Sequence, residues 1–123
     1  MRDEWSDVAN FLVVYVREAH PSDEWEMDSN TKAGVRIPQP RSLDERRAAA
    51  AKFVEHLRAT LPVVVDGIDD AASIPYGAWP ERLWVIGADG RVVYRGGPGP
   101  FEFRPEEVVE VLRGLRAAGT PRP

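Results

Sequence analysis

The apolar residues of this chain gather in short runs, separated by longer segments in which they recur at helical spacing. The first run covers residues 11–16 and consists of β-branched, aromatic and leucine side chains. A run of this length is too short to cross a membrane and is typical of a buried strand in a parallel sheet. A second run, Val63 to Val65, follows Pro62 and predicts another strand.

A long helix is predicted between these strands. Ser42 precedes Glu45 by three residues, which is the spacing of a capping box, so the helix should begin there. Arg46, Lys52 and Arg58 are expected nearer solvent, and Pro62 should end the pattern. The apolar stripe consists of Leu43, Ala50, Phe53, Val54, Leu57 and Leu61.

The second half of the chain predicts a hairpin and a closing helix. Residues 82–86 and 91–95 flank a turn with the pair Asp89-Gly90, which favours an antiparallel hairpin. Pro105 suits the first position of a helix that should stop near Gly119, with residues 120–123 fraying. Its expected buried stripe is Val108, Val111, Leu112 and Leu115.

Three further segments are less regular. Residues 2–9 place Trp5, Val8 and Ala9 at helical spacing and resemble the tail of a helix. Residues 27–41 lack a clear period and are expected to form a loop, either a lid or a wall that contacts substrate. A short loop or helical turn should connect the second strand to the hairpin.

Composition narrows the class of protein. The length of 123 residues and the 43% apolar content suit one domain over residues 1–123. The net charge is −4, with no basic stripe, so we expect neither nucleic acid nor an anionic membrane as a partner. The start of the chain has no apolar segment of signal-peptide length, and a cytoplasmic location is the expectation. The absence of cysteine excludes disulfides and removes the usual redox nucleophile from this sequence.

The strongest candidate chemistry follows the first strand, where open α/β sheets place their sites. Glu18 and His20 lie two residues apart, so on an extended segment both side chains would point to one side and the carboxylate could orient the imidazole as a proton donor. In the alternative interpretation His20 caps a neighbour and Glu18 is solvated. With Asp23, these residues would make an improbable metal site, and we expect neither a metal nor a cofactor.

Several motifs in order resemble the iodothyronine deiodinase family. They are the strand and loop of residues 11–25, Pro62-Val63-Val64-Val65-Asp66, the run of residues 76–86, and Gly99-Pro100-Phe101-Glu102-Phe103 followed by Pro105-Glu106-Glu107-Val108. The resemblance implies an α/β fold, a thioredoxin-like mixed sheet flanked by helices. It also implies that an N-terminal strand and helix are missing, and that this strand would lie centrally, between the strand at Phe11 and the one at Leu83.

The resemblance implies an oxidoreductase that removes halogen reductively from an aromatic substrate with the help of a thiol reductant. The family's nucleophile, selenocysteine or cysteine, would lie upstream of Met1, so this chain alone should be inactive. An in-frame UGA codon upstream, misread as a stop, would explain such a start. Two alternatives stay open: a non-catalytic thioredoxin-fold binding or partner module, and a peroxiredoxin-like thiol reductase. A homodimer also stays open.

Site residues carried over from the resemblance begin with Glu18 and His20, which would line the pocket and deliver a proton. Asp23 and Trp25 complete the loop motif, although Glu24 stands where the family usually has glycine. Arg36 would clamp a substrate carboxylate, with a solvated loop arginine as the equal alternative.

Trp79 and Pro80 precede the strand at Leu83. The resemblance implies a cis peptide bond there that faces the nucleophile and would present backbone groups to a substrate. On sequence alone, a trans proline that starts a strand is favoured.

Overall fold

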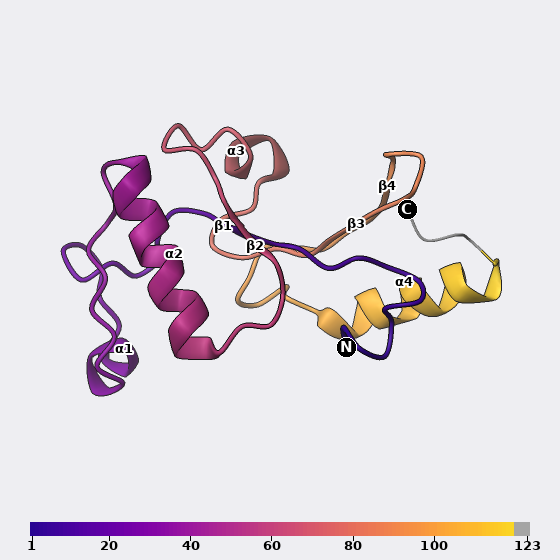
Figure 1. Cartoon of the computed structure of the whole chain (residues 1–123), viewed down its shortest axis with the longest axis horizontal. Helices are drawn as coiled ribbons and strands as arrows, with labels where there is room; N and C mark the ends of the chain where they lie inside the picture. Colours follow the sequence, from indigo (N-terminus) through magenta and orange to yellow (C-terminus); the bar gives the residue numbers. More distant parts are fainter. Residues whose placement is uncertain (120–123) are drawn as a thin grey trace. The chain divides into compact units, whose positions relative to one another are not determined.

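The computed structural model describes residues 1–119 as a mixed α/β chain (Figure 1). The predicted fraying of residues 120–123 lies outside this described part. The chain forms two compact units, Val13–Pro80 and Met1–Leu12 with the segment from Glu81 onward. Its elements, in order, are β1 (Val13–Tyr15), α1 (Asp28–Lys32), α2 (Leu43–Leu57), β2 (Val63–Val65), α3 (Ser73–Tyr76), β3 (Trp84–Ile86), β4 (Val92–Arg95) and α4 (Pro105–Ala117).

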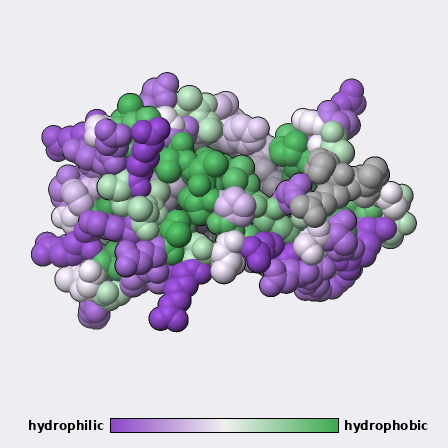
Figure 2. All heavy atoms as spheres, viewed as in Figure 1, coloured by the Kyte–Doolittle hydropathy of each residue, from purple (hydrophilic) through white to green (hydrophobic). Residues whose placement is uncertain are grey.

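In the unit Val13–Pro80, β1 and β2 form a parallel two-stranded sheet with Val14 opposite Val64. Helix α2 covers one face, where the rings of Tyr15 and Phe53 meet edge to face at 5.5 Å. The other face is open, since Val14 is 43% exposed and Val64 45%. The prediction of a fully buried strand is therefore wrong for β1, because the described part of this unit covers only one face. Apolar residues accordingly appear on the surface in Figure 2.

Helix α2 begins as predicted, and the hydroxyl of Ser42 accepts a hydrogen bond from Glu45 N at 3.2 Å. The Glu45 carboxylate accepts a hydrogen bond from Arg41 N at 2.7 Å, whereas a capping box would pair it with Ser42 N, one residue later. The helix ends at Leu57, before Pro62, because Arg58 takes a left-handed conformation. The expected polarity of the helix is wrong at two positions: Arg46 is 2% exposed, whereas Leu57 is 59% exposed.

Two short helices complete this unit. Helix α1 forms a brief helical segment inside residues 27–41, where the sequence predicted an irregular loop. Helix α3 confirms the helical turn expected before the hairpin.

In the other unit, β3 and β4 form the predicted antiparallel hairpin, with an irregularity between Val85 and Ile86. Gly90 supplies the positive φ, 77°, that its turn requires. Helix α4 starts with Pro105, and Leu112 is 1% exposed in a buried cluster with Val108. That cluster also contains Trp5 and Val8.

Residues 1–9 form hydrogen-bonded turns and not a regular helix, although Trp5 and Val8 are buried as the helical spacing suggested. Arg116 of α4 lies over the Trp5 ring at 4.0 Å and binds the Asp7 carboxylate at 2.6 Å. This contact holds the pKa of Asp7 below its ordinary value. Among residues 1–119 no helix has the length and apolar content needed to cross a membrane.

Candidate functional site

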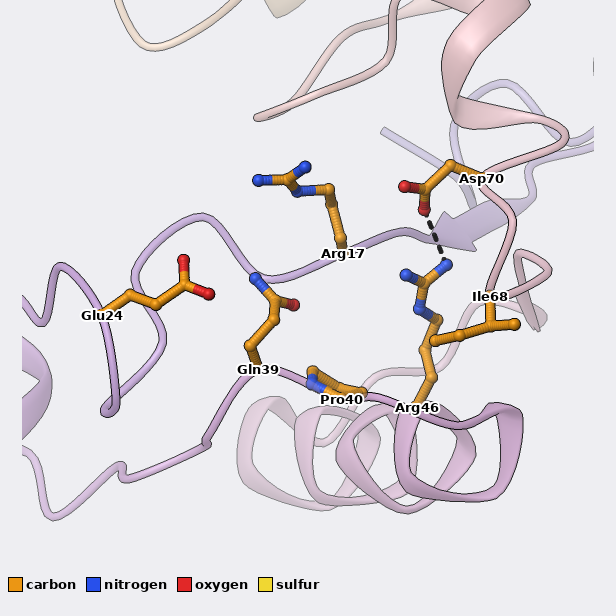
Figure 3. Close-up of a pocket in the computed structure, with 7 residues that line it drawn as sticks. All are labelled: Arg17, Glu24, Gln39, Pro40, Arg46, Ile68 and Asp70. Atoms are coloured by element: carbon orange, nitrogen blue, oxygen red, sulfur yellow. Dashed lines mark hydrogen bonds and ion pairs between the residues drawn. The ribbon is translucent and has the colours of Figure 1, made fainter.

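The two parallel strands β1 and β2 end at the same edge of their sheet, so the segments that leave them lie together. At this edge the structure has a pocket of about 240 Å³ (Figure 3). Side chains from the segment after β1, from the residues before α2, from α2 itself and from the segment after β2 contribute to it. Its lining residues are Arg17, Glu24, Gln39, Pro40, Arg46, Ile68 and Asp70.

Glu18 lies beside this pocket and is held through both its backbone and its side chain. Gln39 bonds the Glu18 backbone twice, as acceptor from its N–H and as donor to its carbonyl, each at 3.1 Å. The hydroxyl of Tyr15 donates to the Glu18 carboxylate. Burial raises the pKa of Glu18 above its ordinary value, while the positive charge of Arg46 opposes this shift. Glu18 therefore keeps a proton to higher pH than a solvated glutamate.

His20 packs on Trp25, with ring centroids 4.7 Å apart. Its Nδ1 lies 3.2 Å from the backbone oxygen of Trp25, whose side chain is largely exposed. Within the described residues, no hydrogen bond or ion pair joins His20 to the Glu18 carboxylate. The structure thus places both residues on one loop, but each with a different partner.

Asp23 and Arg36 lie in the same unit. The Asp23 carboxylate accepts a hydrogen bond from Gln39 N at 2.7 Å, so Gln39 connects the segments of Glu18 and Asp23. The Arg36 side chain is 70% exposed, and its Nε lies 3.6 Å from a carboxylate oxygen of Glu26. Arg36 is not among the residues that line the pocket.

The peptide bond between Trp79 and Pro80 is cis, as the resemblance implies. The trans isomer favoured on sequence alone is wrong. The indole N–H of Trp79 donates to the Glu18 carbonyl at 3.4 Å, and the guanidinium of Arg17 lies 5.4 Å from the centre of its ring. Trp79 thus joins the segment after β1 to the end of this unit.

Sequence reasoning missed Arg17, Gln39 and Arg46. The Arg46 guanidinium binds the Asp70 carboxylate at 2.8 Å and also donates to the Gly67 carbonyl. A signal for its burial was present, because Arg46 precedes the apolar residue Ala50 by four positions, on one face of α2. For Gln39 and Arg17 we find no local pattern that predicts their contacts.

Asp66, directly after β2, is buried and fixes the loop that carries Asp70. Its carboxylate accepts hydrogen bonds from the backbone N–H groups of Gly67, Ala72 and Ser73, at 2.7–2.9 Å. The carboxylate therefore has a structural role. Among residues 1–119, no group of three or more His, Asp or Glu side chains is arranged to hold a metal ion.

The chain is thus a mixed α/β protein with a pocket at the carboxyl edge of two parallel strands, the edge at which open α/β sheets commonly place their sites. The family model described as iodothyronine deiodinase matches residues 1–116. The chain is 39% identical over 110 residues to the type I iodothyronine deiodinase of Xenopus laevis, a match that covers 89% of this chain and 41% of the relative.

Two further relatives agree. The type II iodothyronine deiodinase of Petromyzon marinus is 41% identical over 121 residues, covering 94% of this chain and 39% of the relative. The thyroxine 5-deiodinase of Sparus aurata is 42% identical over 113 residues, covering 92% of this chain and 40% of the relative. The chain belongs to the iodothyronine deiodinase family. It spans about two fifths of the length of the curated relatives it matches.

Proposed function

We propose that this chain forms the substrate-side part of an oxidoreductase that removes iodine reductively from an aromatic substrate. The observation that carries the proposal is the family match over residues 1–116, together with relatives named as deiodinases. The half-buried glutamate beside the pocket at the edge of β1 and β2 adds a group suited to proton transfer.

The proposal includes a thioredoxin-like fold. The order of a parallel strand pair around α2, an antiparallel hairpin and a closing helix agrees with the later part of that fold. Because the sequence has no cysteine, the thiolate or selenolate must come from outside these 123 residues. The missing strand, which comes before the helix that follows it, would lie between the strand at Phe11 and the one at Leu83 and join them in one sheet.

In the proposed reaction the thiolate or selenolate attacks iodine, the carbon–iodine bond breaks, and the ring carbon takes a proton. A thiol reductant then releases iodide and restores the nucleophile. Glu18 suits the proton-transfer step because burial raises its pKa, and a general acid works best when its pKa approaches the working pH. His20, on the same loop, is the second proton-transfer candidate.

The side chains around the loop after β1, which carries Glu18 and His20, are proposed to contact the substrate. Asp23 and Gln39 hold the loop in place, and the exposed indoles of Trp25 and Trp79 offer flat surfaces to an aromatic ring. The peptide bond between Trp79 and Pro80 offers backbone groups to the substrate. The Arg36 side chain is 70% exposed and could leave Glu26 to bind a substrate carboxylate. A cytoplasmic location and a small thiol as reductant complete the proposal.

The test is iodide release from a diiodothyronine with dithiothreitol, using the longer protein that carries this chain and its cysteine or selenocysteine. His20→Ala should lower the rate by about 100-fold or more, the usual contribution of a general acid. His56→Ala, at an exposed position of α2, is the matched control and should leave the rate unchanged. No iodide release by the longer protein would favour the non-catalytic binding module, and equal rates for the two variants would remove His20 from the mechanism.

A further inference from the structure

The side-chain amide of Gln39 bonds both backbone groups of Glu18. Its Oε1 accepts a hydrogen bond from the Glu18 N–H, and its Nε2 donates to the Glu18 carbonyl, each at 3.1 Å. Paired bonds of this kind normally join two strands, and here a side chain makes them. They fix the Glu18 backbone and therefore the direction in which its carboxylate leaves the chain. In Figure 3 the Gln39 side chain extends from the segment before α2 toward the segment after β1.

The same segment also holds the far end of the loop. The backbone N–H of Gln39 donates to the Asp23 carboxylate at 2.7 Å, and that of Ser22 donates to the Ile37 carbonyl at 2.8 Å. The loop is therefore attached at its start and at its end to residues 37–39. His20 lies between the two points of attachment.

The sequence makes residues 38–40 a stiff support for these bonds. Gln39 stands between Pro38 and Pro40. A proline ring locks its own φ angle, and a residue that precedes proline is confined to extended backbone, so this tripeptide has little conformational freedom. Because proline has no N–H, Gln39 supplies the one backbone donor of the three residues, and that donor binds Asp23. Precise placement of a reactive group requires a rigid support of this kind.

The placement of the loop also determines the state of the Glu18 carboxyl. Burial raises its pKa, because the charged form loses water. Two groups from neighbouring elements act on it: the Tyr15 hydroxyl of β1 donates to the carboxylate, and the positive charge of Arg46 on α2 opposes the shift. Release of the loop would let water reach the carboxylate, and its pKa would fall toward the ordinary value.

We propose that Gln39 is a positioning residue for the reaction, which holds the loop of residues 18–23 so that the Glu18 carboxylate stays in place to deliver a proton. This inference rests on the proposed function and adds to it a residue that acts through Glu18. Proton transfer needs the donor within hydrogen-bond reach, and a displacement of about 1 Å can cost about 100-fold in rate. Loss of the Gln39 bonds should therefore slow the chemical step more than it weakens substrate binding.

The test measures iodide release by the longer protein with Gln39→Met, which keeps the length of the side chain and removes its hydrogen bonds. We expect kcat to fall about tenfold or more while KM changes by less than about threefold. Lys52→Met, at an exposed position of α2, is the control and should leave both constants unchanged. Equal kcat values for Gln39→Met and Lys52→Met would overturn the proposal.

Two further readouts separate positioning from a merely structural role. In a Glu18→Gln background, Gln39→Met should cost much less in kcat, whereas an undiminished effect would show that Gln39 does not act through Glu18. Since a general acid must be protonated, kcat/KM should fall as pH rises through the pKa of Glu18, and this fall should occur at lower pH in Gln39→Met. A smaller folded fraction would lower the rate without moving the pH of the fall.

The Glu18 carboxyl is also titrated directly by nuclear magnetic resonance in the longer protein, its signal being assigned from its loss in Glu18→Gln. The pKa of Glu18 should be lower in Gln39→Met than in the unmodified protein and unchanged in Lys52→Met. An unchanged pKa in Gln39→Met would overturn the proposal. No iodide release by the unmodified longer protein would refute the proposed reaction, whereas the titration would still decide whether Gln39 holds Glu18 in place.

Discussion

The ion pair between Arg46 and Asp70 gives the sharpest prediction for stability. The Arg46 side chain is 3% exposed and that of Asp70 22%, so the pair is largely removed from water. Asp70→Asn removes the negative charge and keeps the size of the side chain. Asparagine also tolerates the positive φ of 56° at this position, which alanine would not, so backbone strain does not confuse the result.

The expected loss is worked from the burial of both partners. A hydrogen bond to a charged group contributes about 1.5–3 kcal/mol, and breaking a fully buried pair costs about 3–5 kcal/mol. Water reaches part of Asp70, and Gly67 still accepts a bond from Arg46, so the lower range applies. We expect Asp70→Asn to reduce the free energy of unfolding by ~2 kcal/mol.

The assay is urea denaturation followed by circular dichroism, with Asp69→Asn as the exposed neighbouring control. A double-mutant cycle with Arg46→Met then isolates the pair, because methionine fills the space of the arginine stem without its charge. The double variant should be less destabilised than the sum of the single variants, by ~1–2 kcal/mol. A loss for Asp70→Asn no larger than that for Asp69→Asn, or additive single effects, would refute the reasoning.

Four more outcomes are expected. Leu112→Ala should cost ~3 kcal/mol in urea denaturation, because this side chain is 1% exposed, whereas the exposed Leu57→Ala should cost far less. Ser42→Ala should cost about 1 kcal/mol through loss of the α2 cap, and an unchanged midpoint would contradict that role. Because burial raises the folded-state pKa of Glu18, its contribution to stability is present at pH 4 and lost as pH rises through that pKa. The free energy of unfolding of Glu18→Gln, relative to that of the unmodified protein, should therefore be more favourable at pH 7.5 than at pH 4. A difference that does not change with pH would argue against the raised pKa. The 123-residue chain without cysteine, assayed with dithiothreitol, should release no iodide from a diiodothyronine above the rate of dithiothreitol alone, and faster release would show that no cysteine or selenocysteine beyond these residues is needed.

Local signals predicted much of the fold correctly. The start of α2 at Ser42, the hairpin around Gly90 and the start of α4 at Pro105 each depend on residues close in sequence, and all three are confirmed. The exposure of Val14 could not be predicted, because an apolar run has the same pattern whether one face of its strand is covered or both.

The charged lining of the pocket shows the limit of local reasoning. Arg46 was expected near solvent, since an arginine between polar neighbours on a helix is usually hydrated. Its partner Asp70 lies 24 residues further along the chain, and no periodic pattern connects positions so far apart. Likewise, the role of Gln39 depends on bonds to Glu18, 21 residues earlier.

The carboxylate of Asp66 has a consequence for protein engineering. It accepts hydrogen bonds from backbone N–H groups at both ends of the loop between β2 and α3, so the shape of that loop depends on one side chain at its start. Ile68 lies within the loop, is 42% exposed and lines the pocket. Randomising position 68 should therefore change the rim of the pocket while the loop keeps its path, which makes this position a good starting point for altering ligand preference.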